Sequence, residues 1–267
     1  MSEIENIAKQ MIAKGRGILA ADESTGTMTK RLSSVNIEST SKNRLKFREA
    51  LFSAEGTKKY IGGVILYDET IKQKTSSGKT IPELIRSFGS IPGIKVDTGA
   101  KKLAGSPEEK ITEGLDGLRE RLAEYYKLGA RFAKWRAVYN ISEEYPSKLA
   151  IKSNSHALAR YAALIQEAKM VPIVEPEVLM DGEHNIMKCY EVTDRVLKEC
   201  YKELKLHNVN LKGTILKPNM ILPGNKSKDK NNALEIAKMT LECLKENVPN
   251  EVPGIAFLSG GQTEIEA

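Results

Sequence analysis

The sequence predicts an α/β fold, a (β/α)8 barrel in which parallel strands alternate with helices. Three observations support this prediction. Several apolar runs are continuous rather than alternating, which is typical of parallel strands buried on both faces. Segments with the apolar period of helices lie between them. Charged or small polar residues stand at the carboxyl ends of these runs, where barrel enzymes collect their catalytic groups.

Seven apolar runs predict the strands. The first ends in the carboxylate of Asp22, and the sixth contains Lys217 where the strand should stop. In chain order the runs are 17–22, 62–67, 93–97, 131–136, 171–177, 213–219 and 254–261. Because the carboxyl ends of parallel strands meet at one end of a barrel, we expect their terminal side chains to lie close together.

Apolar residues at helical spacing predict five helices. Ser2 and Glu5 have the spacing of a capping box at the start of the first, and Gly129 has the position of a C-cap. The apolar stripes are Ile7, Met11 and Ile12; Leu115, Leu118, Leu122 and Tyr126; Ala157, Leu158, Tyr161, Ala162 and Ile165; Cys189, Val192, Val196 and Cys200; and Ala233, Ile236, Ala237, Leu241 and Leu244.

A doubly wound sheet is the alternative architecture. Such a sheet is expected to carry a Gly-rich phosphate loop after an early strand, but no G-x-G-x-x-G or Walker sequence stands at any of the predicted strand ends. The barrel is therefore preferred. The length of 267 residues suits one barrel, so we expect residues 1–267 to form a single domain.

Composition and charge narrow the class of partner. The net charge is +6, but the lysines are dispersed and aromatic residues make up only 6%, so we expect no nucleic acid partner and favour a small anionic substrate. No stretch approaches the roughly 18 apolar residues of a membrane span, and the amino-terminal segment is acidic, unlike a signal sequence. These features predict no membrane association and a cytoplasmic location.

Cysteines and histidines give no sign of a metal or a disulfide. Cys189, Cys200 and Cys243 are odd in number, and we expect reduced thiols in the core. His156, His184 and His207 are far apart in the sequence and make no ligand pattern with the cysteines. The sequence therefore predicts no metal and no cofactor, so a reaction that breaks a C–C bond would need a protein side chain to accept the electrons of that bond.

Lys217 is the strongest candidate for that role. A lysine in a buried strand end is pushed toward its neutral, nucleophilic form, whereas the alternative is a lysine that is only paired with a carboxylate. Lys134 and Lys95 would favour the neutral form by repulsion between like charges. Glu175 could move protons during dehydration, and Asp22 could accept a hydroxyl proton. A Schiff base on Lys217 would then accept the electrons of a breaking C–C bond.

The chain resembles the class I fructose-1,6-bisphosphate aldolases, the metal-free aldolases that use a Schiff base. The resemblance extends from about residue 10 onward. The matching stretches are GILAADESTGTMTKRL from Gly17, IGGVILYDET from Ile61, GIKVD from Gly93, FAKWR from Phe132, VPIVEPE from Val171, GTILKPNM from Gly213 and GIAFLSGGQ from Gly254. This resemblance implies reversible cleavage of fructose 1,6-bisphosphate to dihydroxyacetone phosphate and glyceraldehyde 3-phosphate, and it implies a homotetramer.

The resemblance also assigns the site residues. It makes Lys217 the Schiff-base lysine, Glu175 the acid/base of the imine steps, and Asp22 the group that acts on the hydroxyl beside the scissile bond. Lys134 would assist the Schiff base, and Lys95 would bind substrate.

Phosphate-binding residues follow from the same resemblance. Ser259, Gly260 and Gly261 form a small-residue turn that would bind the phosphate on the ketone side. The residues expected near the other phosphate are Ser24, Thr27, Arg31 and Arg136. Alternatives remain for three of these residues, since Ser24 could only cap a turn and both arginines could form surface ion pairs. Glu177 is a further candidate, either for substrate binding or for orienting Lys134.

The resemblance ends before the family's own end. The family continues to an eighth strand that carries another phosphate site, and then to a C-terminal tail, neither of which this chain contains. We therefore expect an incomplete barrel from a longer protein. Two other functions remain open: a different Schiff-base barrel, such as a transaldolase-like or dehydroquinase-like enzyme, and an inactive or weakly active relative that serves as a binding scaffold.

Overall fold

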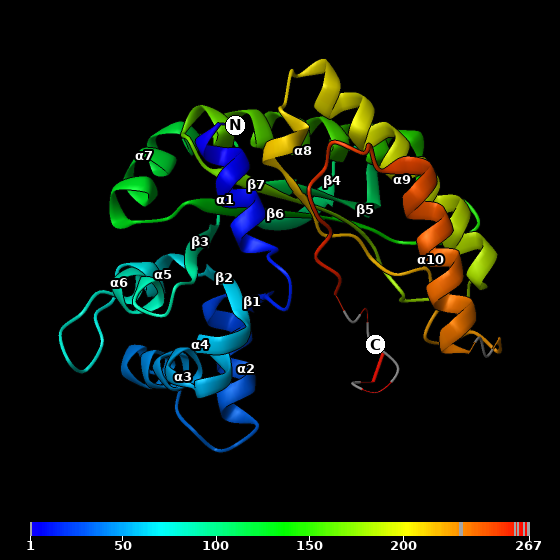
Figure 1. The fold of residues 1–267 in the computed structure, drawn as a ribbon. Coiled ribbons are helices and arrows are strands. Elements are labelled where there is room, and N and C mark those ends of the chain that lie inside the picture. The colour runs from blue at the N-terminus through cyan, green and yellow to red at the C-terminus, as the bar shows by residue number, and fades with distance from the viewer. Residues whose placement is uncertain (1, 230–231, 259, 261, 264, 266–267) are drawn as a thin grey trace.

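Six parallel strands form one curved sheet in the computed structural model, which describes residues 2–229, 232–258, 260, 262–263 and 265. Their order across the sheet is β1-β2-β3-β6-β7-β8, so these six strands lie side by side in the order in which they occur in the chain, as in a barrel. The strands are β1 Gly17–Ala21, β2 Ile61–Leu66, β3 Ile91–Lys95, β6 Phe132–Tyr139, β7 Val171–Val178 and β8 Ile215–Leu216. The curled sheet confirms the prediction of an incomplete (β/α)8 barrel (Figure 1).

Helices cover the outer face of this sheet. In the half of the molecule that contains β6 and β7, helices α8 and α9 pack on the strands and α10 packs against α9 (Figure 1). The helices are α1 Glu3–Met11, α2 Thr25–Ser33, α3 Ser41–Ser53, α4 Glu55–Tyr60, α5 Asp68–Ile71, α6 Ile81–Arg86, α7 Leu118–Leu128, α8 Lys148–Glu167, α9 Ile186–Leu206 and α10 Ala233–Asn247, with a 3-10 turn at Leu211–Gly213.

The five helices expected from their apolar stripes are all present, and two of their predicted ends are confirmed. The Ser2 hydroxyl accepts a hydrogen bond from the Glu5 amide at 3.4 Å, and the Glu5 carboxylate accepts one from the Ser2 amide at 3.3 Å, so the capping box forms. Gly129 ends α7 with a φ of 110°, a conformation that glycine adopts with little strain.

The last two predicted strands are shorter than expected. Only Ile215–Leu216 of the run 213–219 is a strand, because the 3-10 turn precedes it and Pro218 provides no N–H for a ladder. In the run 254–261, the structure describes a single parallel bridge between Ile255 and Leu216. Leu216 donates to the Gly254 carbonyl at 3.2 Å and accepts from the Ala256 amide at 2.8 Å, so this segment still follows the edge of the sheet.

Two regions contain elements that the apolar patterns do not predict. Helices α2 to α4 lie between β1 and β2, and α5 and α6 lie between β2 and β3. Helix α3 buries only Arg48 and Phe52 among its thirteen residues, so its sequence shows no apolar stripe. An antiparallel hairpin of β4 Gly99–Leu103 and β5 Ser106–Glu113 follows β3. Its strands are mostly polar and exposed, which hides them from a search for apolar runs.

The barrel interior changes from apolar to charged along the strands. Alternate residues of a strand point to opposite faces, so Phe132 and Lys134 share the inner face of β6. The apolar inner layer consists of Ile65, Phe132, Val171, Ile173 and Ile215, which pack with Ala8 and Met11 of α1. Helix α1 therefore closes the amino end of the barrel, and the charged residues face the other end.

A close approach in this layer requires glycine. A Cβ atom at Gly93 would lie 2.3 Å from the ring of Phe132, which is fully buried. The missing side chain on β3 thus leaves the space that the ring occupies in the barrel interior.

The three cysteines are free and buried, as expected. Burial raises the pKa of the Cys200 and Cys243 thiols to about 12. These cysteines therefore behave as apolar core residues rather than as nucleophiles.

Candidate active site

Strand register brings the predicted catalytic residues together at the carboxyl end of the sheet. Lys95 lies opposite Lys134, and Arg136 lies opposite Glu175. Lys217 comes directly after β8, and its amide donates to the Val174 carbonyl at 2.8 Å. The backbone hydrogen bond fixes the point at which the Lys217 side chain leaves the sheet.

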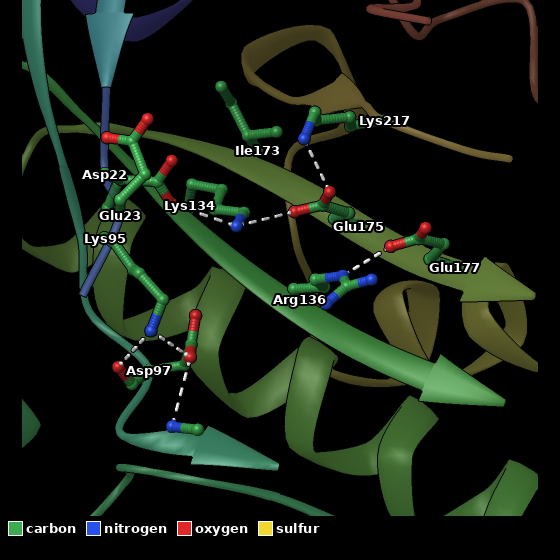
Figure 2. Close-up of polar contacts among 12 residues, drawn as sticks. Asp22, Glu23, Lys95, Asp97, Lys134, Arg136, Ile173, Glu175, Glu177 and Lys217 are labelled. Carbon is green, nitrogen blue, oxygen red and sulfur yellow. Dashed lines mark hydrogen bonds and ion pairs between the residues drawn. The ribbon is translucent and has the colours of Figure 1, made fainter. Parts of the chain in front are cut away.

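Four of these side chains form a continuous series of charges (Figure 2). The Lys217 ammonium lies 2.5 Å from Glu175 Oε1, and the Lys134 ammonium lies 3.0 Å from Glu175 Oε2. Lys134 also contacts Asp22 Oδ2 at 3.1 Å. The Glu175 side chain is only 2% exposed, so these interactions occur with little screening by water.

The charge series explains the electrostatics of Lys134. Burial lowers the pKa of this lysine, but the negative charges of Glu175 and Asp22 outweigh burial and hold its pKa above the usual range. Lys134 is therefore an ammonium that can hold both carboxylates in position. The direct repulsion between Lys134 and Lys217 that the sequence suggested is interrupted, because Glu175 contacts both ammonium groups.

Two further pairs occupy the same end of the sheet. Lys95 donates to Asp97 Oδ1 at 2.5 Å, and in Figure 2 it lies on the opposite side of the site from Lys217. Glu177 pairs with Arg136. Because Lys134 contacts Asp22 and Glu175, the alternative in which Glu177 orients Lys134 is wrong. Lys95 is paired with Asp97.

Two hollows flank this series of charges. The first has a volume of 520 Å³ and is lined by Lys134, Glu175 and Lys217, together with Arg136, Glu177 and Gly260. The second has a volume of 410 Å³ and is lined by Asp22, Ser24, Thr27, Arg31 and Lys95. Arg136 thus belongs to the first hollow and not with Ser24, Thr27 and Arg31, where the sequence analysis expected it.

The phosphate candidates of the second hollow already have local partners. Ser24 is the N-cap of α2 and accepts from the Thr27 amide at 3.4 Å, so the capping alternative is correct for its side chain. Arg31 pairs with Glu23 at 2.5 Å and its side chain is 57% exposed, which leaves it within reach of a ligand. In the turn after the last predicted strand, Gly260 is described, whereas Ser259 and Gly261 lie outside the described residues.

Sequence reasoning missed two residues that support the site. The side chain of Asp97 is 3% exposed and pairs with Lys95, and its position two residues after that lysine was a visible signal. Arg48 is fully buried in α3, where it donates to Thr70 Oγ1 and to the Glu23 carbonyl, both at 2.6 Å. Nothing in the sequence near Arg48 indicates this role, because one partner, Glu23, follows β1 and the other, Thr70, lies in α5.

The histidines are not all separated in space. His156 and His207 have ring centroids 4.9 Å apart, so the expectation drawn from their distance in the sequence is wrong for this pair. In the described part of the chain, no helix is long and apolar enough to cross a lipid bilayer.

A curled parallel sheet with buried lysines and carboxylates at its carboxyl end defines an enzyme of the (β/α)-barrel class. A model of the family "Fructose-bisphosphate aldolase class-I" matches residues 3–267. The chain belongs to the class I fructose-bisphosphate aldolases, which makes it an aldehyde-lyase of glycolysis.

Individual relatives agree with this family. A probable class 1 fructose-bisphosphate aldolase of Xylella fastidiosa is 53% identical over 267 residues, which are 100% of this chain and 80% of the relative. A cytosolic fructose-bisphosphate aldolase of Arabidopsis thaliana is 54% identical over 95% of this chain and 64% of its own length. The solved fructose-bisphosphate aldolase of Plasmodium falciparum, in complex with TRAP and a small-molecule inhibitor, is 45% identical, with a TM-score of 0.97 over 99% of this chain and 77% of that one.

Proposed function

We propose that this enzyme cleaves fructose 1,6-bisphosphate reversibly to dihydroxyacetone phosphate and glyceraldehyde 3-phosphate through a Schiff base on Lys217. The observation that carries this proposal is the 2.5 Å contact between Lys217 and the buried carboxylate of Glu175. Glu175 can take a proton from the Lys217 ammonium, which would release the neutral amine for attack on a ketone. The acceptor and the donor need no rearrangement for this step.

The remaining groups of the series suit the later steps. After loss of water, which Glu175 would assist as an acid, the protonated imine accepts the electron pair of the breaking C–C bond. Asp22 would accept the proton of the hydroxyl beside that bond. Lys134 contacts both carboxylates and would stabilise their charges while protons move between substrate and protein.

The two hollows support a substrate with a phosphate at each end. We propose that Gly260, with Ser259 and Gly261, binds the phosphate near Lys217, and that Lys95 binds substrate from the second hollow. In that hollow, Ser24, Thr27 and Arg31 would bind the other phosphate. Arg136 and Glu177 line the first hollow, and we assign them to substrate positioning there.

Borohydride reduction in the presence of dihydroxyacetone phosphate tests the assignment. The expected result is one covalent adduct per chain, located on Lys217 by peptide mass spectrometry. A Lys217→Met variant should give no adduct and no cleavage activity, whereas the matched control Lys212→Met, which removes an exposed lysine five residues earlier, should behave like the unaltered enzyme. An adduct that forms equally well in the Lys217→Met variant would refute the assignment.

We further propose that residues 1–267 form one domain, that the protein is cytoplasmic and that it assembles as a homotetramer. The shared core of the sheet and its helices supports one domain. An inactive scaffold is not favoured, because Lys217, Glu175 and Lys134 are present and in contact. Light scattering coupled to size-exclusion chromatography tests the assembly, and a monomeric mass at micromolar concentration would refute the tetramer.

A further inference from the structure

Three possible metal ligands meet on the outer surface of the barrel, away from the charge series. His156 lies on α8, Glu203 lies on α9, and His207 is the C-cap of α9. One potential donor atom from each residue lies within 4.8 Å of the others. His156 Nδ1 is 3.3 Å from Glu203 Oε2, and His207 Nδ1 is 3.7 Å from the same oxygen.

The two packed helices produce this arrangement. Glu203 and His207 are four residues apart, so they share one face of α9. Helix α8 packs along α9 and brings His156 to the same face. The side chains are partly open to solvent, with exposed fractions of 54% for His156 and 21% for His207, so an ion has a direct path to them.

The donor atoms match the needs of a zinc ion. Zinc binds imidazole nitrogen and carboxylate oxygen at about 2.0–2.2 Å in tetrahedral geometry, which separates neighbouring donors by about 3.3 Å. The distance between His156 Nδ1 and Glu203 Oε2 has this value. His207 Nδ1 lies 2.9 Å from the Glu203 carbonyl oxygen and donates to it, the kind of bond that fixes the tautomer of metal-bound histidines, so the lone pair of Nε2 is the one that would bind the ion.

We propose that His156, Glu203 and His207 form a binding site for a divalent transition-metal ion, Zn²⁺ in the first instance, that links α8 to α9. The negative charge of Glu203 would offset part of the ion's charge. Asp116 and Arg160 line the hollow beside His207, and their opposite charges leave little net effect on a cation there. The site does not depend on the proposed Schiff-base chemistry, since none of its residues lines the hollow around Lys217.

Titration calorimetry on the metal-free full chain, first stripped with a chelator, tests this site. Zinc chloride should bind with one equivalent per chain. His156→Gln and Glu203→Gln should each weaken binding by more than about a hundredfold, since loss of a group that only supports a ligand already costs 10–100-fold. The matched control Glu199→Gln removes a carboxylate one turn earlier on α9, where it pairs with Lys202 at 3.3 Å, and should leave binding unchanged.

Two further measurements distinguish a metal site from a simple ion pair. Co²⁺ in place of Zn²⁺ should give the visible absorption of a tetrahedral complex, which disappears in the His156→Gln variant. At a zinc concentration a hundred times the dissociation constant, the melting temperature should rise by roughly 5 °C. The absence of saturable binding, or equal binding by His156→Gln, Glu203→Gln and the unaltered chain, would overturn the proposal and leave His156 and Glu203 as an ion pair.

Discussion

Replacement of Glu175 by glutamine tests whether the charge series stabilises the fold as well as the chemistry. The substitution keeps the shape of the side chain but removes the charge that two ammonium groups share. Lys134 and Lys217 are 7% and 15% exposed, so water can compensate only in part. Removing one partner of a buried ion pair costs about 3–5 kcal/mol. Asp22 still contacts Lys134, so we expect a loss of about 3 kcal/mol, at the lower end of this range.

Glu177→Gln is the matched control, because it makes the same change two residues along β7. Its partner Arg136 has a side chain that is 42% exposed, so loss of this pair should cost less than about 1 kcal/mol. Urea denaturation followed by the fluorescence of Trp135, the single tryptophan, measures both variants. The urea dependence of the free energy of unfolding should stay constant, since the surface exposed on unfolding does not change.

The sign of the pH dependence gives a second check. The pKa of Lys134 is raised in the folded state, so its pairing stabilises the protein fully below the unfolded value of about 10.5 and is lost as pH rises through the folded value. The loss in free energy of unfolding caused by Glu175→Gln should therefore be the same at pH 7 and at pH 9. If Glu175→Gln lowered the free energy of unfolding as little as Glu177→Gln does, Glu175 would not hold the two lysines together.

Three further predictions concern the core. Gly93→Ala should lower the free energy of unfolding by about 1–3 kcal/mol in urea denaturation, because the new methyl group overlaps the ring of Phe132. The control Gly17→Ala has open space around the new methyl group and should change the free energy of unfolding by less than about 0.5 kcal/mol. Burial and a hydrogen bond to a carboxylate raise the pKa of Tyr125 to about 12, so the contribution of Tyr125 to stability is present below pH 10 and is lost as pH rises toward 12. The free energy of unfolding of Tyr125→Phe should therefore fall less than that of the unaltered protein between pH 10 and pH 12. An equal fall would contradict the reasoning. Cys200 should not react with a thiol reagent in the native protein and should react after denaturation, and rapid labelling of the native chain would show that this helix face opens.

The sequence predicted the parts of the fold that depend on local pattern. Continuous apolar runs indicated the buried strands, and charge at their ends indicated Lys217, Glu175 and Asp22. The partners of these residues depend on register, which one-dimensional spacing does not give. Glu177 and Lys134 seemed suited to each other in the sequence, yet the inner face of the sheet pairs Glu177 with Arg136.

Elements stabilised by polar contacts were the ones that sequence analysis missed. Arg48 donates to Thr70 and to the Glu23 carbonyl, which are distant in the sequence, and contacts of this kind produce no periodic pattern in the sequence. The meeting of His156 with His207 was missed for the same reason, since it depends on how α8 packs on α9.

The alternation along β6 and β7 makes enzymatic activity a direct report of correct folding. Lys134 and Trp135 point to opposite sides of one strand, as do Val174 and Glu175 on the next. A shift of the strand register by one residue would place the charged side chains against the packed helices and the core side chains in the substrate site. Misfolded chains with this defect would thus be both unstable and inactive, so turnover per milligram of purified protein measures the fraction of chains whose strands are aligned.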